Sequence, residues 1–219
     1  MLNPDANARR ASCPRCQRPL STCLCRWITP IDSDIDVVIL QHPLEVNNAK
    51  NSARLLHLSL VGSRLAVAEI FPETELRTLV YGAPDAAVRR PLLLYPHTPE
   101  QIALGLTAPP DPDRAWTADP APVRLVVLDG TWRKSRKMLY LNPLLQSLPR
   151  LALHDTEPSR YRIRKAHKVD QLSTLEACCH GLMQLDAEPQ KFARLLDAFD
   201  GFVEQQTTVA ESGKMLNRC

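Results

Sequence analysis

Short apolar runs rich in Val, Ile and Leu alternate along this chain with longer amphipathic segments, and this alternation constrains the fold more than any other feature. The run VRLVVLD at residues 123–129 is the clearest, because its β-branched residues are typical of a buried strand. Further strands are predicted at residues 35–40, 63–70, 90–96 and 150–154. Strands that alternate with helices predict an α/β domain with a mainly parallel sheet, flanked by helices.

The segments around these runs fit helices. Helices are expected at residues 43–60, 72–82, 98–106, 131–148, 172–186 and 189–206. The helix at 131–148 is expected to bend or end near Pro143, because proline lacks the amide that the helix needs. Residues 107–122 hold five prolines and are expected to form a surface loop. We therefore predict one α/β domain over residues 31–219, preceded by a small metal-binding segment over residues 1–30.

Four cysteines lie within thirteen positions near the start of the chain, in the pattern C-x2-C-x6-C-x-C, at Cys13, Cys16, Cys23 and Cys25. The first residues lack the apolar core of a secretory signal, so we expect a cytoplasmic protein whose thiols stay reduced. Each close pair can supply two thiolates to one ion, and four sulfur ligands suit tetrahedral zinc. The pattern predicts a structural zinc site without a catalytic role. The alternatives are an iron–sulfur cluster or another metal, and thiols that are unmetallated or redox-active.

Two common nucleotide-binding motifs are absent from the sequence. No G-x-G-x-x-G follows a predicted strand, no G-x-x-x-x-G-K-[ST] occurs, and the chain holds only seven glycines. Ligands of open α/β sheets bind outside the carboxyl ends of the strands. In this chain those ends carry the sequences QHP (41–43), YPHT (95–98) and DGTW (129–132). We expect the functional site at this edge of the sheet.

The segment that follows the clearest strand carries the most chemistry. Asp129 ends the strand, Gly130 permits a tight turn, and Thr131 suits the N-cap of the next helix. A carboxylate at a strand end can face a ligand, and Trp132 offers a flat face to a base or an adenine ring. The alternative is that Asp129 caps the turn and Trp132 packs in the core.

Nine of the chain's 27 basic residues fall in two groups, at residues 133–137 and 160–168: Arg133, Lys134, Arg136, Lys137, Arg160, Arg162, Arg164, Lys165 and Lys168. Such clusters neutralise phosphates and supply the sequence-independent part of nucleic-acid affinity. The alternative is a solvated face balanced by acids elsewhere. Arg162 and Arg164 alternate as in an extended segment, so one of them can face inward and clamp a carboxylate.

Polar side chains also follow the first predicted strand, at His42, Glu45, Asn48 and Ser52. They lie between a buried strand and a predicted helix, which suits a ligand site as well as helix capping and surface hydrogen bonding. Both interpretations stay open at this point.

Taken in order, the cysteine pattern and the stretches QHPLEVNNAKNSARLL, LLLYP, LDGTW and YRIRK…LSTLEA resemble the DTW-domain family from about residue 13 to 205. The Asp-x-Thr-Trp motif corresponds to Asp129, Thr131 and Trp132, and Ser52 stands where the family usually has Thr. The resemblance implies a SPOUT-like domain with a C-terminal trefoil knot. It also implies transfer of the 3-amino-3-carboxypropyl group of S-adenosylmethionine to N3 of a tRNA uridine, with release of 5′-methylthioadenosine.

The resemblance assigns roles to the residues. Asp129 would take the N3 proton or orient the base, with Thr131 and Trp132 beside it. The S-adenosylmethionine pocket would comprise Leu94, Tyr95, Pro96, Leu128, Asp129, Gly130, Thr131, Trp132, Leu172, Ser173 and Thr174, with Arg162 or Arg164 on the methionine carboxylate. The tRNA would contact Arg133, Lys134, Arg136, Lys137, Lys165 and Lys168. A SPOUT-like RNA methyltransferase and a non-catalytic, zinc-bearing RNA-binding protein are the alternatives; no membrane partner is expected, and a monomer and a homodimer both remain open.

Overall fold

The computed structural model describes residues 11–87, 89–96, 110, 122–154, 156, 159 and 172–216, with side chains in the last helix described as far as residue 209. A five-stranded sheet forms its centre, in the order β2-β1-β4-β3-β5. The strands are β1 (Asp36–Gln41), β2 (Arg64–Val67), β3 (Arg90–Leu94), β4 (Val123–Asp129) and β5 (Arg150–Leu151). Every neighbouring pair is parallel, which confirms the predicted class of sheet.

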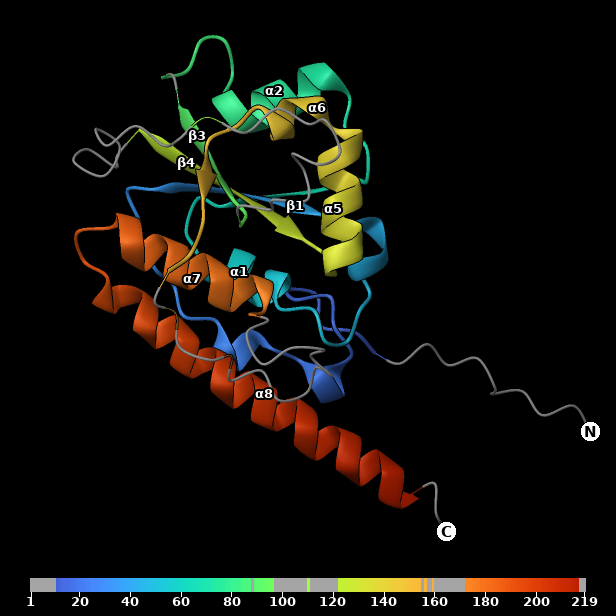
Figure 1. The fold of residues 1–219 in the computed structure, drawn as a ribbon. Helices are drawn as coiled ribbons and strands as arrows, with labels where there is room; N and C mark the ends of the chain where they lie inside the picture. Colours follow the sequence, from blue (N-terminus) through green and yellow to red (C-terminus); the bar gives the residue numbers. More distant parts are fainter. Residues whose placement is uncertain are drawn as a thin grey trace, which may run out of the picture.

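Helices cover both faces of this sheet (Figure 1). The helices α1 (Ala53–Ser59), α7 (Thr174–Leu185) and α8 (Gln190–Leu216) lie on one face, and α2 (Glu73–Tyr81), α5 (Trp132–Leu141) and α6 (Pro143–Gln146) lie on the other. Alternate residues of β4 explain this layering, because Leu125 and Val127 belong to one buried cluster and Val126 and Leu128 to the other. A strand buried on both faces reads as a continuous apolar run, as this one does.

The prediction of a helix over residues 43–60 is wrong for the first half of that range. A 3₁₀ turn, η3 (Pro43–Glu45), precedes a loop, and α1 begins only at Ala53. Two asparagine side chains in this loop accept hydrogen bonds from backbone amides. The Oδ1 of Asn48 accepts from the amide of Lys50 at 3.0 Å, and the Oδ1 of Asn51 accepts from the amide of Arg54 at 3.2 Å. Asparagine side chains compete in this way with helical hydrogen bonds, so the helix starts after them.

Other boundaries differ less. The strands predicted at 63–70 and 150–154 are shorter, with four residues in β2 and two in β5, and α8 extends beyond residue 206 to Leu216. The break expected near Pro143 is confirmed, because α5 ends at Leu141 and α6 starts at that proline. The helix expected at 98–106 and most of the loop expected at 107–122 lie outside the described residues.

The cysteine-bearing segment packs along α8. It contains the 3₁₀ turns η1 (Leu20–Thr22) and η2 (Cys25–Trp27). The Nε1 of Trp27 donates to the Oε1 of Gln205 over 2.6 Å, and the indole covers Gly201, where an added Cβ would lie 2.2 Å from the ring. Leu24 belongs to the same buried cluster as the sheet, so this segment is part of the core; a domain division near residue 30 stays a prediction.

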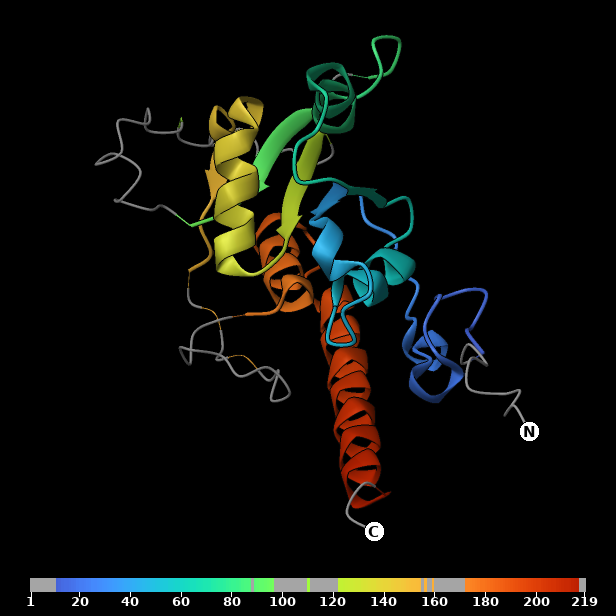
Figure 2. The same ribbon diagram turned by 90° about the vertical axis from the view of Figure 1, so that its right-hand side faces the viewer.

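Figure 2 shows α8 running on past the rest of the fold toward the C-terminus, beside the cysteine-bearing segment. Within the described part of the chain, no helix is both long and apolar enough to cross a membrane.

Candidate active site

The carboxyl ends of β1 and β4 meet at one edge of the sheet. Gln41 and Asp129 are register partners on these neighbouring strands, so their side chains leave the sheet together. Gly130 then turns the chain into α5, where Thr131 is the N-cap and its side chain accepts from the amide of Lys134. A Cβ on Gly130 would lie 3.1 Å from the Cβ of Lys134, so the tight turn leaves little room for a side chain.

Asp129 is almost fully buried at this edge, with only 3% of the residue exposed. Its Oδ2 accepts from the Nε2 of Gln41 at 2.8 Å and from the Nδ2 of Asn51 at 2.7 Å, and its Oδ1 accepts from the Oγ1 of Thr174 at 2.7 Å. Burial raises the pKa of Asp129, while these three donors lower it and the charge of Glu45 raises it. The carboxylate thus joins β1, the 46–52 loop and α7 instead of capping its own turn.

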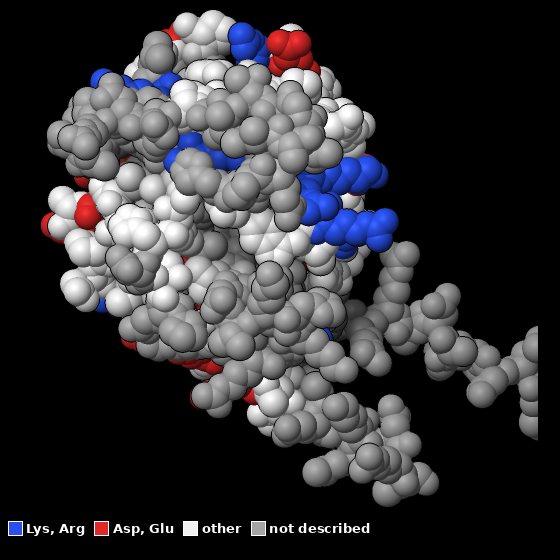
Figure 3. Space-filling view, viewed as in Figure 1, with Lys and Arg blue, Asp and Glu red and all other residues white. Residues whose placement is uncertain are grey.

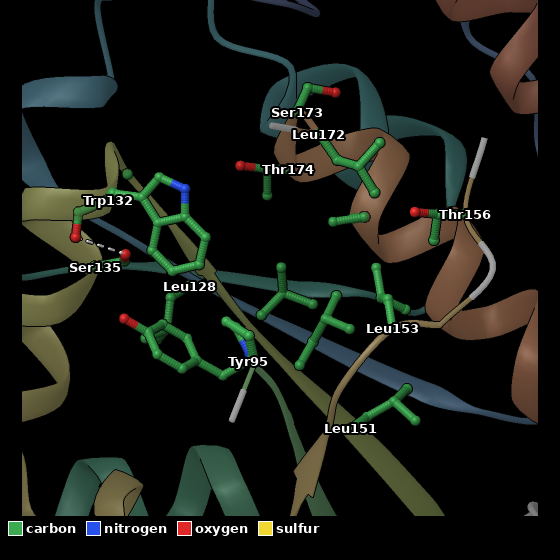
Figure 4. A pocket seen from close by; sticks show the side chains of 15 residues that line it. Tyr95, Leu128, Trp132, Ser135, Leu151, Leu153, Thr156, Leu172, Ser173 and Thr174 are labelled. Atoms are coloured by element: carbon green, nitrogen blue, oxygen red, sulfur yellow. Dashed lines mark hydrogen bonds between the residues drawn. The ribbon is translucent and has the colours of Figure 1, made fainter. Parts of the chain in front are cut away.

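An apolar cavity of about 370 Å³ opens beside this edge (Figure 4). Its lining comprises Leu94, Tyr95, Pro96, Val127, Leu128, Gly130, Trp132, Ser135, Leu151, Leu153, Thr156, Leu172, Ser173, Thr174 and Ala177. Of the residues predicted to bind a cofactor, nine lie together here: Leu94, Tyr95, Pro96, Leu128, Gly130, Trp132, Leu172, Ser173 and Thr174. Arg162 and Arg164, predicted for the same site, lie outside the described residues.

Two aromatic rings form one side of this cavity. Tyr95 is buried, whereas 45% of Trp132 is exposed, so the indole stands at the cavity's opening and not in the core. The two rings meet edge to face, with centroids 5.6 Å apart and planes at 76°. Figure 4 shows them facing Leu151 and Leu153 across the cavity, with the start of α7 between. A flat ligand group fits between aromatic and aliphatic walls of this kind.

A smaller, polar cavity of about 110 Å³ adjoins the first. It is lined by Glu45, Asn48, Lys50, Asn51, Ser52, Asp129, Gly130, Thr131, Ser173 and Thr174. Asp129 and Thr131, predicted for the cofactor pocket, line this polar cavity instead. Gly130, Ser173 and Thr174 line both cavities, so these three residues form the boundary between them.

At this boundary α7 starts with a full capping box. The side chain of Ser173 accepts from the amide of Glu176, and the carboxylate of Glu176 accepts from the amide of Ser173 at 2.7 Å. The amide of Leu175 also donates to the hydroxyl of Ser52 at 3.3 Å. Ser52 therefore uses its hydroxyl to fix the start of α7 against the loop.

The basic residues of α5 gather on one side of the molecule, as the blue surface over this helix shows (Figure 3). Two of them form ion pairs at the strand edge: Lys134 with Glu45 at 2.7 Å and Lys137 with Glu69 at 2.8 Å. Glu45 is buried and also accepts from the Nδ2 of Asn48, so Lys134 lies at the rim of the polar cavity. Lys165 and Lys168 lie outside the described residues.

The four cysteines of the N-terminal segment come together as a possible metal site, since their sulfur atoms all lie within 4.8 Å of one another. The Sγ atoms of Cys13 and Cys25 are 3.5 Å apart, and those of Cys16 and Cys23 are 3.7 Å apart. A tetrahedron with Zn–S bonds of about 2.3 Å has edges of about 3.8 Å, so the set fits such an ion. Hydrogen bonds from the backbone of Cys16 and Arg15 lower the pKa of Cys13 to about 6, whereas burial and the neighbouring thiols raise the pKa of Cys25 to about 12, so the case for a metal rests on the sulfur geometry.

Sequence reasoning assigned no role to several members of the site. Gln41 and Asn51 hold the carboxylate of Asp129, and Leu151, Leu153 and Ser135 line the apolar cavity. A signal for Gln41 existed, because it is a polar residue at the end of an apolar strand. The leucines carried no signal, since an apolar cavity wall and a core strand have the same pattern.

Comparisons with known proteins agree with one another. The family model described as "DTW domain" matches residues 10–207. The chain is 28% identical to tRNA-uridine aminocarboxypropyltransferase 2 of Drosophila melanogaster over 193 residues. This match covers 86% of the chain and 72% of the fly protein. It is 31% identical over 143 residues to tRNA-uridine aminocarboxypropyltransferase A of Arabidopsis thaliana, covering 62% of this chain and 52% of the plant protein.

A mouse protein, tRNA-uridine aminocarboxypropyltransferase 2, is 28% identical over 182 residues, which cover 81% of this chain and 57% of the mouse protein. The matches thus span little more than half the length of the plant and mouse relatives. No solved structure gives a significant match to this chain.

Proposed function

The chain belongs to the DTW-domain family, and from this premise we propose that it is a tRNA-uridine aminocarboxypropyltransferase. The proposed reaction moves the 3-amino-3-carboxypropyl group of S-adenosylmethionine to N3 of a uridine in tRNA and releases 5′-methylthioadenosine. One observation carries the proposal: an apolar cavity and a polar cavity share a wall, and the polar one contains the buried carboxylate of Asp129.

The apolar cavity suits the donor. Its volume of about 370 Å³ lies within the roughly 300–1,000 Å³ of small-molecule sites. The rings of Tyr95 and Trp132 and the opposite leucines suit an adenine ring, and the hydroxyls of Ser173 and Thr174 suit the polar tail. S-adenosylmethionine supplies a carbon chain activated by the neighbouring sulfonium. We assign the methionine carboxylate to Arg162 or Arg164, as expected from the sequence.

The polar cavity suits the acceptor. The N3–H of uridine is a donor between two carbonyl acceptors, so its partner must accept at the centre. Oδ1 of Asp129 receives one hydrogen bond, from Thr174, and retains acceptor capacity for the N3–H. Asn48, Lys50 and Ser52 also line this cavity, so polar side chains surround the proposed acceptor position.

The same carboxylate can then move the proton. Burial raises the pKa of Asp129 and makes it a stronger base than an exposed aspartate. In the proposed step the N3 proton passes to Asp129 while a bond forms between N3 and the γ-carbon of the methionine moiety. The bond from that carbon to sulfur breaks, and its electron pair stays on sulfur. Gly130 and Thr174 at the boundary hold the two partners in line.

Three finer proposals accompany this function. The four cysteines hold a structural zinc ion, for which their spacing is suitable. The parallel sheet is the core of a SPOUT-like fold with a C-terminal trefoil knot. The exposed basic residues of α5 contact tRNA, and a tRNA substrate together with reduced cysteines suits the cytoplasm.

A labelling experiment tests the function. The protein is incubated with unmodified tRNA and S-adenosylmethionine labelled either in the carboxyl carbon or in the methyl carbon, and the tRNA is digested to nucleosides for mass spectrometry. We expect the carboxyl label in a modified uridine and no methyl label in the tRNA. Transfer of the methyl label alone would make the protein a methyltransferase. No transfer, together with no binding of S-adenosylmethionine by calorimetry, would leave an RNA-binding protein.

A further inference from the structure

Arg18 follows directly on the turn that carries the first two cysteines. The amide of Cys13 donates to the carbonyl of Arg18 and the amide of Gln17 to that of Cys13, both over 2.8 Å, and Gln17 has a φ of 58°. Cys13 and Cys16 bracket this turn, so an ion bound by their sulfurs restrains the backbone from which Arg18 projects. Only 9% of Arg18 is exposed.

The guanidinium of Arg18 bridges three parts of the molecule. Within its own segment, Nε donates to the carbonyl of Thr22 at 3.1 Å. Toward α8, the guanidinium lies over the ring of Phe202 at 5.1 Å, and Nη2 approaches the Oε1 of Gln206 at 3.4 Å. Toward the site, Nη2 donates to the carbonyl of Ala49. The last contact connects the cysteine segment to the 46–52 loop.

This loop forms one wall of the polar cavity, through Asn48, Lys50, Asn51 and Ser52. Residues 46–50 are all exposed, so buried apolar side chains do not hold the first part of the loop. Hydrogen bonds hold it instead: the amide of Asn51 donates to the carbonyl of Asn48 at 2.9 Å, and the Nδ2 of Asn51 donates to Asp129. A segment with exposed hydrogen bonds and no apolar anchor opens easily, so a charged donor from outside has a large effect on it.

We propose that a metal ion bound by Cys13, Cys16, Cys23 and Cys25 (the metal clip) positions the 46–52 loop of the polar cavity through Arg18. We call this coupling the brace. The metal fixes the turn, Arg18 fixes the carbonyl of Ala49, and the loop in turn presents Asn51 to Asp129. Arg18 is therefore a positioning residue and does not touch the substrate. The consequence for transfer rests on the proposed function, whereas the coupling of the clip to the loop does not.

Two variants distinguish the hydrogen bond from Arg18 to Ala49 from the packing of Arg18 against α8. Arg18→Met keeps an unbranched chain over Phe202 but loses the donors to Ala49 and, within its own segment, to Thr22. Gln206→Met is the matched control, because it removes the partner on α8 and leaves the bond to Ala49 intact. Both variants are purified with Zn²⁺, and their metal content is measured so that loss of the ion is detected directly.

The readout is amide hydrogen exchange of peptides covering residues 46–56, followed by mass spectrometry. We expect Arg18→Met, with its zinc retained, to exchange roughly tenfold faster in this segment than the wild type, as the loss of one charged hydrogen bond implies. Gln206→Met should match the wild type. Removing zinc from the wild type should give the same acceleration, and removing it from Arg18→Met should add little.

Three results would overturn this proposal. The first is an exchange rate of residues 46–56 in Arg18→Met equal to that of the wild type, and the second is an exchange rate in Gln206→Met as fast as that in Arg18→Met. The third is loss of zinc from Arg18→Met. If metal-free protein unfolds throughout, the zinc-loaded variants still decide whether Arg18 holds the loop, and unfolding on zinc removal would overturn the local role of the metal. Once transfer is measured, Arg18→Met should raise KM for tRNA severalfold at unchanged affinity for S-adenosylmethionine. A protein without transferase activity would fail this second assay while the exchange result stands.

Discussion

The Nδ2 of Asn51 lies 2.7 Å from the Oδ2 of Asp129, although the two residues are 78 positions apart in the chain. This bond connects an exposed loop to the end of the central strand β4. It occupies one oxygen of the carboxylate together with Gln41 and leaves the other oxygen to Thr174 and a ligand. The candidate base is therefore oriented before any substrate arrives, which is a general requirement for efficient proton transfer.

Replacing Asp129 with Asn removes the proposed base with little change in size. We expect transfer to fall by at least about 100-fold, while the affinity for S-adenosylmethionine changes little. The free energy of unfolding should change by no more than about 1–3 kcal/mol, because Asn keeps one oxygen for the donors of Gln41 and Asn51 and turns an amide donor toward Thr174. Asp186→Asn, which removes a carboxylate paired with Lys191 outside the site, is the control. Normal turnover by Asp129→Asn would exclude the carboxylate from the mechanism.

The pH dependence of transfer should report the same group. Burial raises the pKa of Asp129 above its ordinary value, and a base must be ionised, so kcat/KM should rise as the pH rises through that raised pKa. Thr174→Val removes a donor that lowers this pKa. The acidic limb of the profile of kcat/KM against pH should therefore move up by about one pH unit. Thr174→Ser keeps the hydroxyl and should leave the limb in place. A limb unmoved by Thr174→Val would assign it to another group.

Stability should change with pH in the opposite direction. The pKa of Asp129 is higher in the folded protein than in the unfolded chain, so its ionisation opposes folding. The free energy of unfolding contributed by this group should therefore decrease as the pH rises from about 4 to the folded pKa. Thermal unfolding of the wild type and of Asp129→Asn across this range measures it, and the difference between the two proteins should vary with pH. A constant difference would contradict the raised pKa.

Trp132 should contribute to donor binding through its exposed face. Trp132→Ala should weaken the binding of S-adenosylmethionine by about 1–3 kcal/mol, the usual value for an aromatic ring stacked on a base. Trp132→Phe keeps a ring against Tyr95 and should lose less. Tyr140→Ala, on the same helix and 67% exposed, is the control. Calorimetry measures all three, and an unchanged dissociation constant for Trp132→Ala would remove the indole from the donor site.

The basic residues of α5 should divide into two kinds. Arg133→Ala with Lys137→Ala should weaken tRNA binding and reduce the slope of log K against log salt by roughly 0.7–0.9 for each phosphate that the protein no longer neutralises. Lys134→Ala should instead destabilise the protein, because it leaves the buried carboxylate of Glu45 without its cation. Arg77→Ala on α2 is the control for tRNA binding. An unchanged salt slope in the double variant would make this surface a solvated face.

The sequence was sufficient to predict β4 to the residue and the break at Pro143, because continuous burial and proline geometry act locally. The family resemblance grouped nine residues of the apolar cavity from distant segments, but the side-chain bonds between distant segments were not predicted. The bonds from Gln41 and Asn51 to Asp129 require the register of β1 with β4 and the path of the 46–52 loop, neither of which leaves a local pattern. The contact of Arg18 with Ala49 is of the same kind, since it exists only once the cysteine segment has packed.

A crystal structure of the protein with S-adenosylmethionine tests the central claim most directly. The adenosine should lie between the aromatic pair Tyr95 and Trp132 and the leucines opposite. The methionine chain should reach the boundary at Gly130 and Thr174, with its γ-carbon directed at the polar cavity that contains Asp129. A donor bound elsewhere, or one whose amino-acid chain points away from Asp129, would contradict the two-cavity mechanism.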